Sequence, residues 1–384
     1  MENPVFDYII CGGGASGLLL LYALSEDPFF SKKDILLIEK ESKNTNDRTW
    51  SFWEKKEGAF EGLLEKKWDT ANFLSSSVSL DFKLAPYQYK MLRSKGFYKT
   101  CHEKIERQKN IQYLSAKITS ITNEGITSKV STNKGFFSSK NVFNSVFDPT
   151  ALYNQKKYPV LKQHFIGWFI KTKLEQFDPN KILFMDFNIE QKKETRFLYV
   201  LPLDSKNALV EYTLFSANLL EKKEYEEGIQ SYLKNQGIIE YEIKEKEQGN
   251  IPMSSFPFDQ FNTSSLLNIG TAGGWTKAST GFTFMNTTRN VSKVVSFLKT
   301  GKPLNRFNIK NRFSFYDLLF LDVLFKYNSQ GSKLFERMFE KNTPLTIFRF
   351  LDEKTSFVEE LRIASSFSLR QISWFLMALI RRLF

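Results

Sequence analysis

The chain has 384 residues, of which 54 are Lys or Arg and 42 are Asp or Glu, so its formal net charge is +12. Aromatic residues make up 15% and include 38 Phe, enough for a hydrophobic core, which excludes disorder as the main state. Two Cys and two His are too few for a disulfide framework or an ordinary zinc site, and we expect no metal.

The positive charge allows a nucleic acid or an anionic membrane surface as partner. Many Lys residues alternate with Glu, as in residues 221–224 and 240–247, and we interpret these runs as solvated helix faces. This pattern disfavours nucleic-acid binding. No apolar run reaches the roughly 18 residues of a membrane-spanning helix. With no secretory signal recognisable, we expect a cytoplasmic protein.

The first forty residues are predicted to form a strand, a tight turn, a helix and a second strand. Residues 6–10 and 35–38 are short β-like runs, and residues 18–25 have helical composition. A strand–helix–strand opening implies a parallel sheet.

The turn after the first strand has the pattern G-x-G-x-x-G, from Gly12 to Gly17. The pattern is weak by itself, but here it follows a strand and opens a helix, as a dinucleotide site requires. Gly14 lets the backbone approach a pyrophosphate, and Gly17 lets the helix pack on the strand. Glu39 ends the second strand, where a carboxylate can bind a ribose hydroxyl. A glycine-rich turn without a ligand is the alternative.

Three strand-like runs follow in the middle of the chain, at 184–187, 197–201 and 208–215, and predict an antiparallel platform. A last β run, 266–269, leads to a second glycine-rich turn, and we expect a helix to begin at Thr280-Gly281. A second helix start that faces a cofactor is typical of flavoproteins, because its positive end suits the negative charge of a reduced flavin. This favours FAD over NAD.

The chain is helical and rich in Phe after Arg306. Residues 369–384 combine apolar side chains with Trp374, Arg381 and Arg382, as in a helix that lies on a membrane surface. A helix packed on the protein's own core has the same composition, so both alternatives stay open.

Several blocks resemble motifs of the lycopene β-cyclases of carotenoid synthesis, in that family's order. The first is Asp-Arg-Thr-Trp-Ser-Phe-Trp at residues 47–53. Glu211 matches the family's essential glutamate, although Tyr212 stands where plant members carry a second one. Ala278 and Phe282 also depart from the Pro and Tyr common in the family. The further matching blocks are residues 163–168, 184–187, 199–213, 251–253 and 269–277, with weaker similarity at 335–351.

The resemblance implies an α/β fold with three parts. These are a Rossmann-like FAD-binding domain similar to flavoprotein monooxygenases, an inserted mixed or antiparallel sheet domain for the substrate, and a helical C-terminus. The first part is predicted to contain residues 1–80, 100–160 and 260–300, and the second 81–99 and 161–259. Residues 301–384 are predicted to form the third part, the helical C-terminus, for which membrane contact is one of the alternatives.

The resemblance also implies an isomerase, an intramolecular lyase that closes the ends of linear lycopene to β-rings, giving γ-carotene and then β-carotene. It implies reduced FAD, replenished by NAD(P)H without net redox change, in a bacterial protein peripheral on the inner face of the cytoplasmic membrane. Protonation of a terminal double bond creates a carbocation, which calls for an acid, a base, negative charge and dry aromatic walls. Whether the flavin or Glu211 delivers the proton stays open.

Two other functions compete with this interpretation. A flavin monooxygenase or a prenyl or carotenoid reductase on the same fold would consume NAD(P)H with each turnover. A carotenoid-binding membrane-surface protein would have no catalytic residue at all.

Glu211 is the predicted acid and base, because burial among Val210, Tyr212 and Leu214 would raise the pKa of its carboxyl. An outward-facing, ion-paired carboxylate is the alternative. The predicted substrate-binding residues, each with core packing as its alternative role, are Trp50, Phe52, Trp53, Tyr212 and Trp275. The predicted cofactor-binding residues are Gly12, Gly13, Gly14, Ala15, Ser16, Gly17, Glu39, Lys40, Arg48, Thr49, Gly270, Thr271, Ala272, Gly273, Thr280 and Gly281. His164 is predicted to be a structural, hydrogen-bonded residue.

Overall fold

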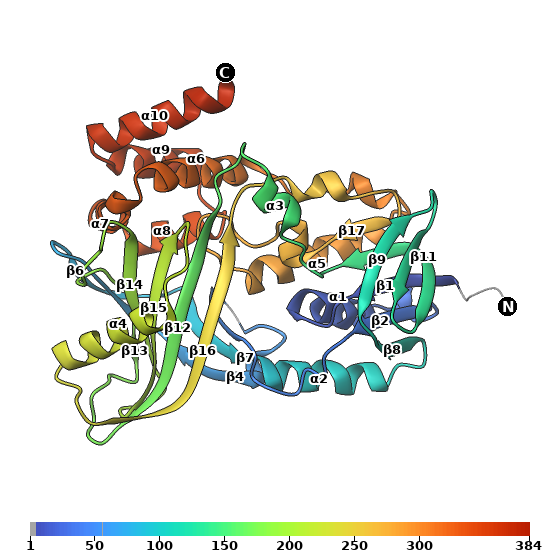
Figure 1. Ribbon diagram of the computed structural model, residues 1–384, viewed down its shortest axis with the longest axis horizontal. Helices are drawn as coiled ribbons and strands as arrows, with labels where there is room; N and C mark the ends of the chain where they lie inside the picture. The colour runs from blue at the N-terminus through green and yellow to red at the C-terminus, as the bar shows by residue number, and fades with distance from the viewer. Residues whose placement is uncertain (1–4, 56) are drawn as a thin grey trace. The chain divides into compact units, whose positions relative to one another are not determined.

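The computed structural model describes residues 5–55 and 57–384 (Figure 1). The chain divides into two compact units, and each is assembled from three separate segments. Unit 1 consists of Met1–Trp50, Arg93–Lys156 and Ser255–Asn311. Unit 2 consists of Ser51–Leu92, Lys157–Ser254 and Arg312–Phe384.

These boundaries differ from the predicted ones at several places, and two of the differences are large. Residues 51–80, predicted to join the cofactor domain, belong to unit 2, and the C-terminal helices join unit 2 as well. The cause is strand pairing, since the strand Thr70–Leu74 pairs in parallel with Lys181–Asp186. Such a long-range pairing leaves no mark on local sequence composition.

Unit 1 contains a seven-stranded, mostly parallel sheet. Its strands are β1 (Val5–Cys11), β2 (Ile35–Glu39), β8 (Ile111–Ser115), β9 (Ile118–Asn123), β10 (Ser128–Thr132), β11 (Gly135–Asn144) and β17 (Leu266–Asn268). The order is β8-β2-β1-β11-β10-β9, and β17 pairs in parallel with β11. The predicted strands at 6–10 and 35–38 are β1 and β2, which pair in parallel as the strand–helix–strand opening requires.

Helices cover this sheet. The helical elements of unit 1 are α1 (Ala15–Glu26), η1 (Pro28–Phe30), α2 (Ser94–Glu106), α3 (Thr150–Asn154), η3 (Phe258–Phe261), η4 (Gly270–Gly273), α5 (Phe284–Leu298) and η5 (Leu304–Arg306). The predicted helix at 18–25 lies within α1, which packs against both α2 and α5. Because α1 has helices and sheet around it, most of its apolar residues are buried rather than only one face.

Unit 2 contains a larger sheet of seven strands and a smaller one of three. Its strands are β3 (Thr49–Glu54), β4 (Leu64–Trp68), β5 (Thr70–Leu74), β6 (Ser79–Lys83), β7 (Gln88–Arg93), β12 (Leu161–Thr172), β13 (Lys181–Asp186), β14 (Thr195–Pro202), β15 (Asn207–Ser216) and β16 (Tyr241–Met253). The larger sheet has the order β16-β12-β15-β14-β13-β5-β6, and the smaller one β3-β7-β4.

The predicted antiparallel platform corresponds to β13, β14 and β15, which pair in antiparallel order. The interpretation of residues 240–247 as a solvated helix face was wrong, because they lie almost entirely in β16, the edge strand beside β12. Lys and Glu are common on exposed sheet edges, where they discourage pairing with other chains, so charge alone does not distinguish the two structures.

The two faces of the larger sheet are covered differently. Helix α4 (Lys222–Asn235) packs on β12 and β15. Side chains on this face, Trp168, Val210 and Tyr212 among them, form one core cluster with α4. Successive side chains of a strand point to opposite faces, so Gly167 and Glu211 face the other way.

The C-terminal part of unit 2 consists of η6 (Asn328–Gln330) and the helices α6 (Arg312–Lys326), α7 (Gly331–Lys341), α8 (Pro344–Leu351), α9 (Phe357–Ser366) and α10 (Leu369–Leu383). Figure 1 shows α10 outermost, beyond α9 and α6. Its inner face is packed, since Trp374 stacks on Tyr327 with ring centres 4.3 Å apart and Arg382 binds the buried Asp322. Among the residues that the structure describes, no helix is long and apolar enough to cross a membrane.

Candidate functional site

The first glycine-rich turn connects β1 to α1 in a tight and constrained geometry. Gly12 has φ +98°, a left-handed conformation that favours glycine, and its N–H donates to the Ile38 carbonyl over 2.8 Å. A Cβ on Gly17 would overlap the carbonyl oxygen of Gly12. By contrast, nothing lies within 4 Å of a Cβ built on Gly14. The turn is therefore closed at both ends and open at its centre.

This open centre fits the pyrophosphate of a dinucleotide such as FAD. The first N–H groups of α1 have no acceptor within their own helix, and they mark its positive end. The first turn of α1 contains no acidic residue and Gly14 offers no capping side chain, so no carboxylate of that turn competes with a phosphate.

Glu39 lies at the carboxyl end of β2, beside the same turn. Its side chain is buried, and its two oxygens accept hydrogen bonds from the backbone N–H groups of Gly13, over 2.6 Å, and Glu41, over 2.9 Å. A carboxylate has further lone pairs, so Glu39 can still accept a ribose hydroxyl. Lys40 points outward and forms an exposed ion pair with Glu41.

The second glycine-rich turn lies directly against the first. Gly270 has φ +61°, and a Cβ on it would overlap the side chain of Ser16 at the start of α1. The structure therefore brings together two of the segments predicted to bind the cofactor, Gly12–Gly17 and Gly270–Gly273, although their sequence separation is large.

The helix after this turn begins later than predicted. α5 begins at Phe284 and not at Thr280-Gly281. Gly281 has φ +73°, which is incompatible with a right-handed helix, and its N–H closes a turn onto the Lys277 carbonyl. Thr280 and Gly281 thus form the loop that precedes α5.

Two other predicted cofactor residues, Arg48 and Thr49, lie where the polar loop ends. Arg48 is exposed, and its guanidinium donates to the backbone carbonyl of Asp47 over 2.6 Å. Thr49 is half-buried at the first position of β3. Neither observation gives these residues a cofactor contact, so that role stays a prediction.

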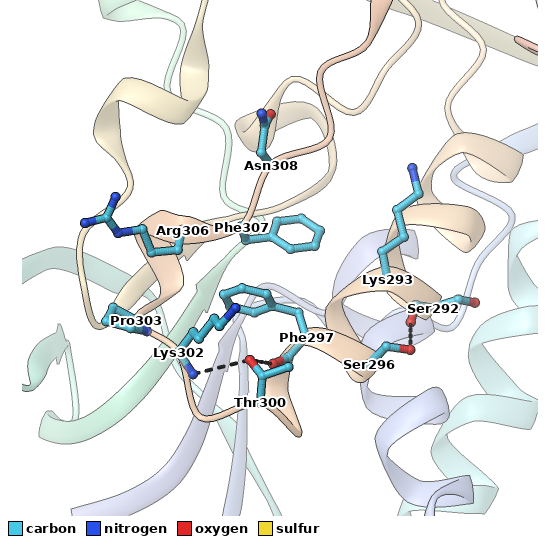
Figure 2. A pocket seen from close by; sticks show the side chains of 10 residues that line it. All are labelled: Ser292, Lys293, Ser296, Phe297, Thr300, Lys302, Pro303, Arg306, Phe307 and Asn308. Carbon is cyan, nitrogen blue, oxygen red and sulfur yellow. Dashed lines mark hydrogen bonds between the residues drawn. The ribbon is translucent and has the colours of Figure 1, made fainter.

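Unit 1 also has an open cavity of about 1070 Å³ at the C-terminal end of α5. Its lining includes the rings of Phe297 and Phe307 and the cationic side chains of Lys293, Lys302 and Arg306 (Figure 2). Its lining residues are Ser292, Lys293, Ser296, Phe297, Thr300, Lys302, Pro303, Arg306, Phe307 and Asn308. None of the predicted site residues is among them.

In unit 2, Glu211 lies in the middle of β15 and is only 8% exposed. Its neighbours across the strands are Tyr199 on β14 and Gly167 on β12. Burial raises the pKa of the Glu211 carboxyl well above its ordinary value, and the neighbouring carboxyl of Glu247 raises it further. A carboxyl group in this environment favours the protonated form and can act as an acid.

Aromatic side chains cover the sheet face on which Glu211 lies. The Tyr199 hydroxyl donates to the hydroxyl of Tyr89 over 2.6 Å, and the Tyr89 ring is 5.9 Å from that of Phe184. Phe184 in turn contacts Phe348 of α8. Further ring contacts extend this layer to Trp53, Phe73, Phe187, Phe197, Phe215, Phe335 and Phe339. We call this set the aromatic layer.

The predicted substrate residues lie in different places. Trp53 belongs to the aromatic layer, through its contact with Phe348 at 5.1 Å. Tyr212 lies on the opposite face from Glu211, in the core beneath α4, where its hydroxyl binds Arg196. The structure therefore does not bring Tyr212 beside Glu211.

The other three aromatic residues are also packed in cores. Phe52 is buried in β3 of unit 2. In unit 1, Trp50 contacts Phe284 at 5.2 Å, and the buried Trp275 contacts Phe307 at 6.4 Å. These contacts account for the three side chains as packing residues, and a substrate role stays a prediction.

His164 lies on the α4 face of β12 and has hydrogen bonds at both ring nitrogens, to the hydroxyls of Tyr225 and Ser216. Burial, together with the positive charges of Lys162 and Arg196, lowers its pKa to about 4, so the ring is neutral near pH 7. This agrees with the predicted structural role.

Glu247 is the residue that the sequence analysis missed. It is half-buried and lies on β16, opposite Gly167 of β12. The available signal was the run that ends in Ile251-Pro252-Met253, which with Tyr241 and Ile243 indicates one long strand. Because residues 240–247 were interpreted as a solvated helix face, Glu247 was not considered as a site residue.

Several solved structures have a fold similar to that of this chain. A geranylgeranyl bacteriochlorophyll reductase-like protein from Thermoplasma acidophilum has a TM-score of 0.67 and 12% identity, over 97% of this chain and 99% of that one. A flavoprotein/dehydrogenase from Cytophaga hutchinsonii has a TM-score of 0.62 and 13% identity, over 99% of both chains. The flavin-dependent brominase Bmp2 has a TM-score of 0.61 and 13% identity, over 99% of both chains. These likenesses show a common fold.

Sequence comparison is more specific. A family model described as "Lycopene cyclase protein" matches residues 7–378, nearly the whole chain. No curated protein sequence matches that of this chain significantly.

Proposed function

Because the chain belongs to the lycopene cyclase family, we propose that it is a lycopene β-cyclase that closes the linear ends of lycopene to β-rings without net redox change. The product of the first closure is γ-carotene and that of the second is β-carotene. The observation that carries the proposal is Glu211, a buried carboxyl with a raised pKa on an aromatic sheet face.

In the proposed reaction, the Glu211 carboxyl gives its proton to the terminal C1=C2 double bond and becomes a carboxylate. The C1 carbon is then a tertiary cation, and the electrons of the C5=C6 double bond attack it to close the ring. Loss of the C6 proton to the Glu211 carboxylate forms the ring double bond and restores the acid. Atoms and charge balance, and no electron pair leaves the substrate.

The environment of Glu211 suits this chemistry in two ways. The aromatic layer has no strong nucleophile that would trap a carbocation, and ring faces attract cations. The scarcity of polar groups also excludes water, which would otherwise add to the cation. Tyr89 and Tyr199 are held in one hydrogen bond, and burial raises the pKa of both hydroxyls, so both stay neutral.

The glycine-rich turns are the proposed FAD site. The open centre at Gly14 and the N-terminus of α1 would hold the pyrophosphate, and Glu39 would bind the ribose. When bound in its reduced form, FAD supplies negative charge that stabilises a cation, and NAD(P)H is the proposed reductant.

The test is the variant Glu211→Gln. We expect ring formation to fall by at least roughly a hundredfold, since Gln cannot donate a titratable proton, while FAD remains bound. Expression in lycopene-accumulating bacteria should turn red cells orange for the parent and leave them red for the variant. Glu242→Gln, an exposed residue of β16, is the matched control and should behave like the parent.

Retained β-carotene production in Glu211→Gln would overturn the assignment of this residue. Red cells with the parent chain would overturn the cyclase itself. NAD(P)H consumption in proportion to product would instead favour a monooxygenase or reductase.

We also propose peripheral contact of unit 2 with the inner face of the cytoplasmic membrane through the outer face of α10. Its inner face is packed, but Leu376, Ile380 and Leu383 are 53%, 58% and 64% exposed, and they share one side of the helix. Arg381 stands beside this stripe and suits anionic lipid.

To test the contact without unfolding unit 2, the three leucine and isoleucine residues should be replaced together by Gln. We expect a roughly tenfold or greater loss of binding to anionic vesicles in a flotation assay, because about 0.8 kcal/mol is lost per CH₂ group withdrawn from the membrane. Ile126→Gln, which removes an exposed apolar residue of unit 1, should have no effect. Unchanged flotation of the triple variant would contradict the contact.

A further inference from the structure

Gly167 separates two glutamate side chains on the larger sheet of unit 2. It pairs with Glu211 on one side and with Glu247 on the other. A Cβ on Gly167 would lie 2.8 Å from Cγ of Glu211 and 3.2 Å from Cγ of Glu247. Both side chains therefore lie above the same glycine. They come from β15 and β16, whose backbones are about 9.5 Å apart, twice the usual strand spacing.

A β-bulge brings Glu247 to this face. Ile170 pairs with Ile243, but the preceding residue of β12, Phe169, pairs with Glu245, so Lys244 is an extra residue in β16. Ile243 packs against the core beneath α4, and strict alternation would place Glu247 on that same side. The extra residue reverses the alternation, so that Lys246 lies over the Trp168 ring and Glu247 faces Glu211.

The two side chains lie over the same glycine, close enough that the Glu247 carboxyl raises the pKa of the Glu211 carboxyl. An ionised carboxylate has no hydrogen-bond donor, so two carboxyl groups can bond to each other only when one of them carries a proton. Two close carboxyl groups usually share one proton and one negative charge, because ionising both would place like charges together.

We propose that Glu247 is a positioning residue that shares one proton with Glu211 across Gly167. The inference deepens the proposed function and rests on it. The two residues differ in exposure, since Glu211 is buried and Glu247 is half-buried at the edge strand. Glu247 therefore connects the buried acid with the edge of the sheet.

The charge balance explains the benefit of a second carboxyl. Before reaction the pair carries one negative charge and the substrate none. Once Glu211 has given its proton to the double bond, the pair carries two negative charges and the substrate one positive charge, so the total is unchanged. The cation offsets the repulsion between the carboxylates, and that repulsion favours return of the C6 proton to Glu211.

The other titratable groups around Glu211 have been placed above. Tyr199 of β14 and Tyr89 of β7 face it with neutral hydroxyls, and Glu211 itself raises the pKa of both. On β16, the exposed Glu245 lies on the same side as Glu247. On strand β12 the residues next to Gly167 on this side are Phe165 and Phe169, and the exposed Lys171 follows Phe169 towards the end of the strand.

The experiment is the pH dependence of ring formation by the purified, FAD-loaded protein. The alkaline limb of the rate against pH reports the acid in the enzyme–substrate complex. Glu247→Gln removes the neighbouring negative charge, so this limb should move to lower pH by about one unit, which is tenfold in proton affinity. Gly167→Ala forces the pair apart and should move the limb in the same direction. Glu242→Gln is the control on the same strand.

An alkaline limb at the parental pH in both Glu247→Gln and Gly167→Ala would overturn the proposal, provided that the parent makes rings. Loss of activity without a shift of the limb would also overturn it, since a purely structural role predicts that result. Should Glu247→Gln fail to fold, Gly167→Ala alone decides. A parent that forms no rings refutes the proposed function instead, so the two failures can be told apart.

Discussion

The two units each contain a buried glutamate in the sheet, and the two carboxyl groups have opposite surroundings. Glu39 of unit 1 is 7% exposed and Glu211 of unit 2 is 8% exposed. Glu39 accepts two backbone N–H groups, whereas Glu211 meets a second carboxyl. Backbone donors hold the Glu39 side chain in place as a ligand for hydroxyl groups, whereas the surroundings of Glu211 favour its protonated form. Partners, not burial, therefore decide what a buried glutamate does.

The environments of Glu39 and Glu211 depend on different kinds of contact, one local in the chain and one between separate strands. The Glu39 partners are within 26 residues of it, in a turn whose glycines permit close backbone approach. The Glu211 partner is on another strand, and its direction depends on a one-residue bulge. The first arrangement is local and the second depends on the assembled sheet.

The largest expected effect in this comparison comes from Gly17→Ala. Its Cβ would overlap the backbone oxygen of Gly12, which cannot move aside as a side chain can. We expect purified protein without bound flavin, and a loss of about 1–3 kcal/mol in the free energy of unfolding, the usual cost of overpacking. Flavin absorbance and denaturant titration measure both quantities.

The control for this change is Gly96→Ala in α2, where nothing lies within 4 Å of the new Cβ. This variant should keep its flavin, and its free energy of unfolding should rise by about 0.5–1 kcal/mol, since Ala is the better helix residue. Normal flavin content in Gly17→Ala would show that the turn does not need its close approach.

A smaller effect, of opposite sign in the two units, is expected on thermal stability. Burial and Glu247 raise the pKa of Glu211 above its ordinary 4.5. The stability that this protonated carboxyl contributes is complete below pH 4.5 and is lost as the pH rises through the folded-state pKa. Gln does not titrate, so Glu211→Gln should unfold at a higher temperature than the parent, by roughly 2 °C at about pH 8, with a smaller gain near pH 5.

The matched change in unit 1 is Glu39→Gln. Gln keeps one oxygen but directs an NH₂ group at a backbone N–H. We therefore expect the free energy of unfolding to fall by about 1–3 kcal/mol. Calorimetric unfolding of both variants across this pH range makes the comparison. The contrast between the two sites would be contradicted if Glu39→Gln raised the stability of the protein. It would also be contradicted if Glu211→Gln lowered the stability by an amount that grows with pH.

The sequence by itself determined the features that arise over short distances. The strands around Gly12 and Glu39, the helix between them and the parallel pairing follow from about forty residues, because a strand–turn–helix unit makes its contacts within itself. Glu211 was identified from a motif, and the structure places it in a buried setting that agrees with an acid.

Only the tertiary structure decided the division into units, the contact between the two glycine-rich turns and the Glu211–Glu247 pair. Each depends on strand partners far apart in the chain, and local composition carries no record of a partner. The direction of Glu247 shows the reason most clearly. In a strand one extra residue moves every later side chain to the other face, so Lys244 decides which side Glu247 occupies. A pattern of charges cannot reveal that extra residue, whereas the paired register of β12 and β16 does.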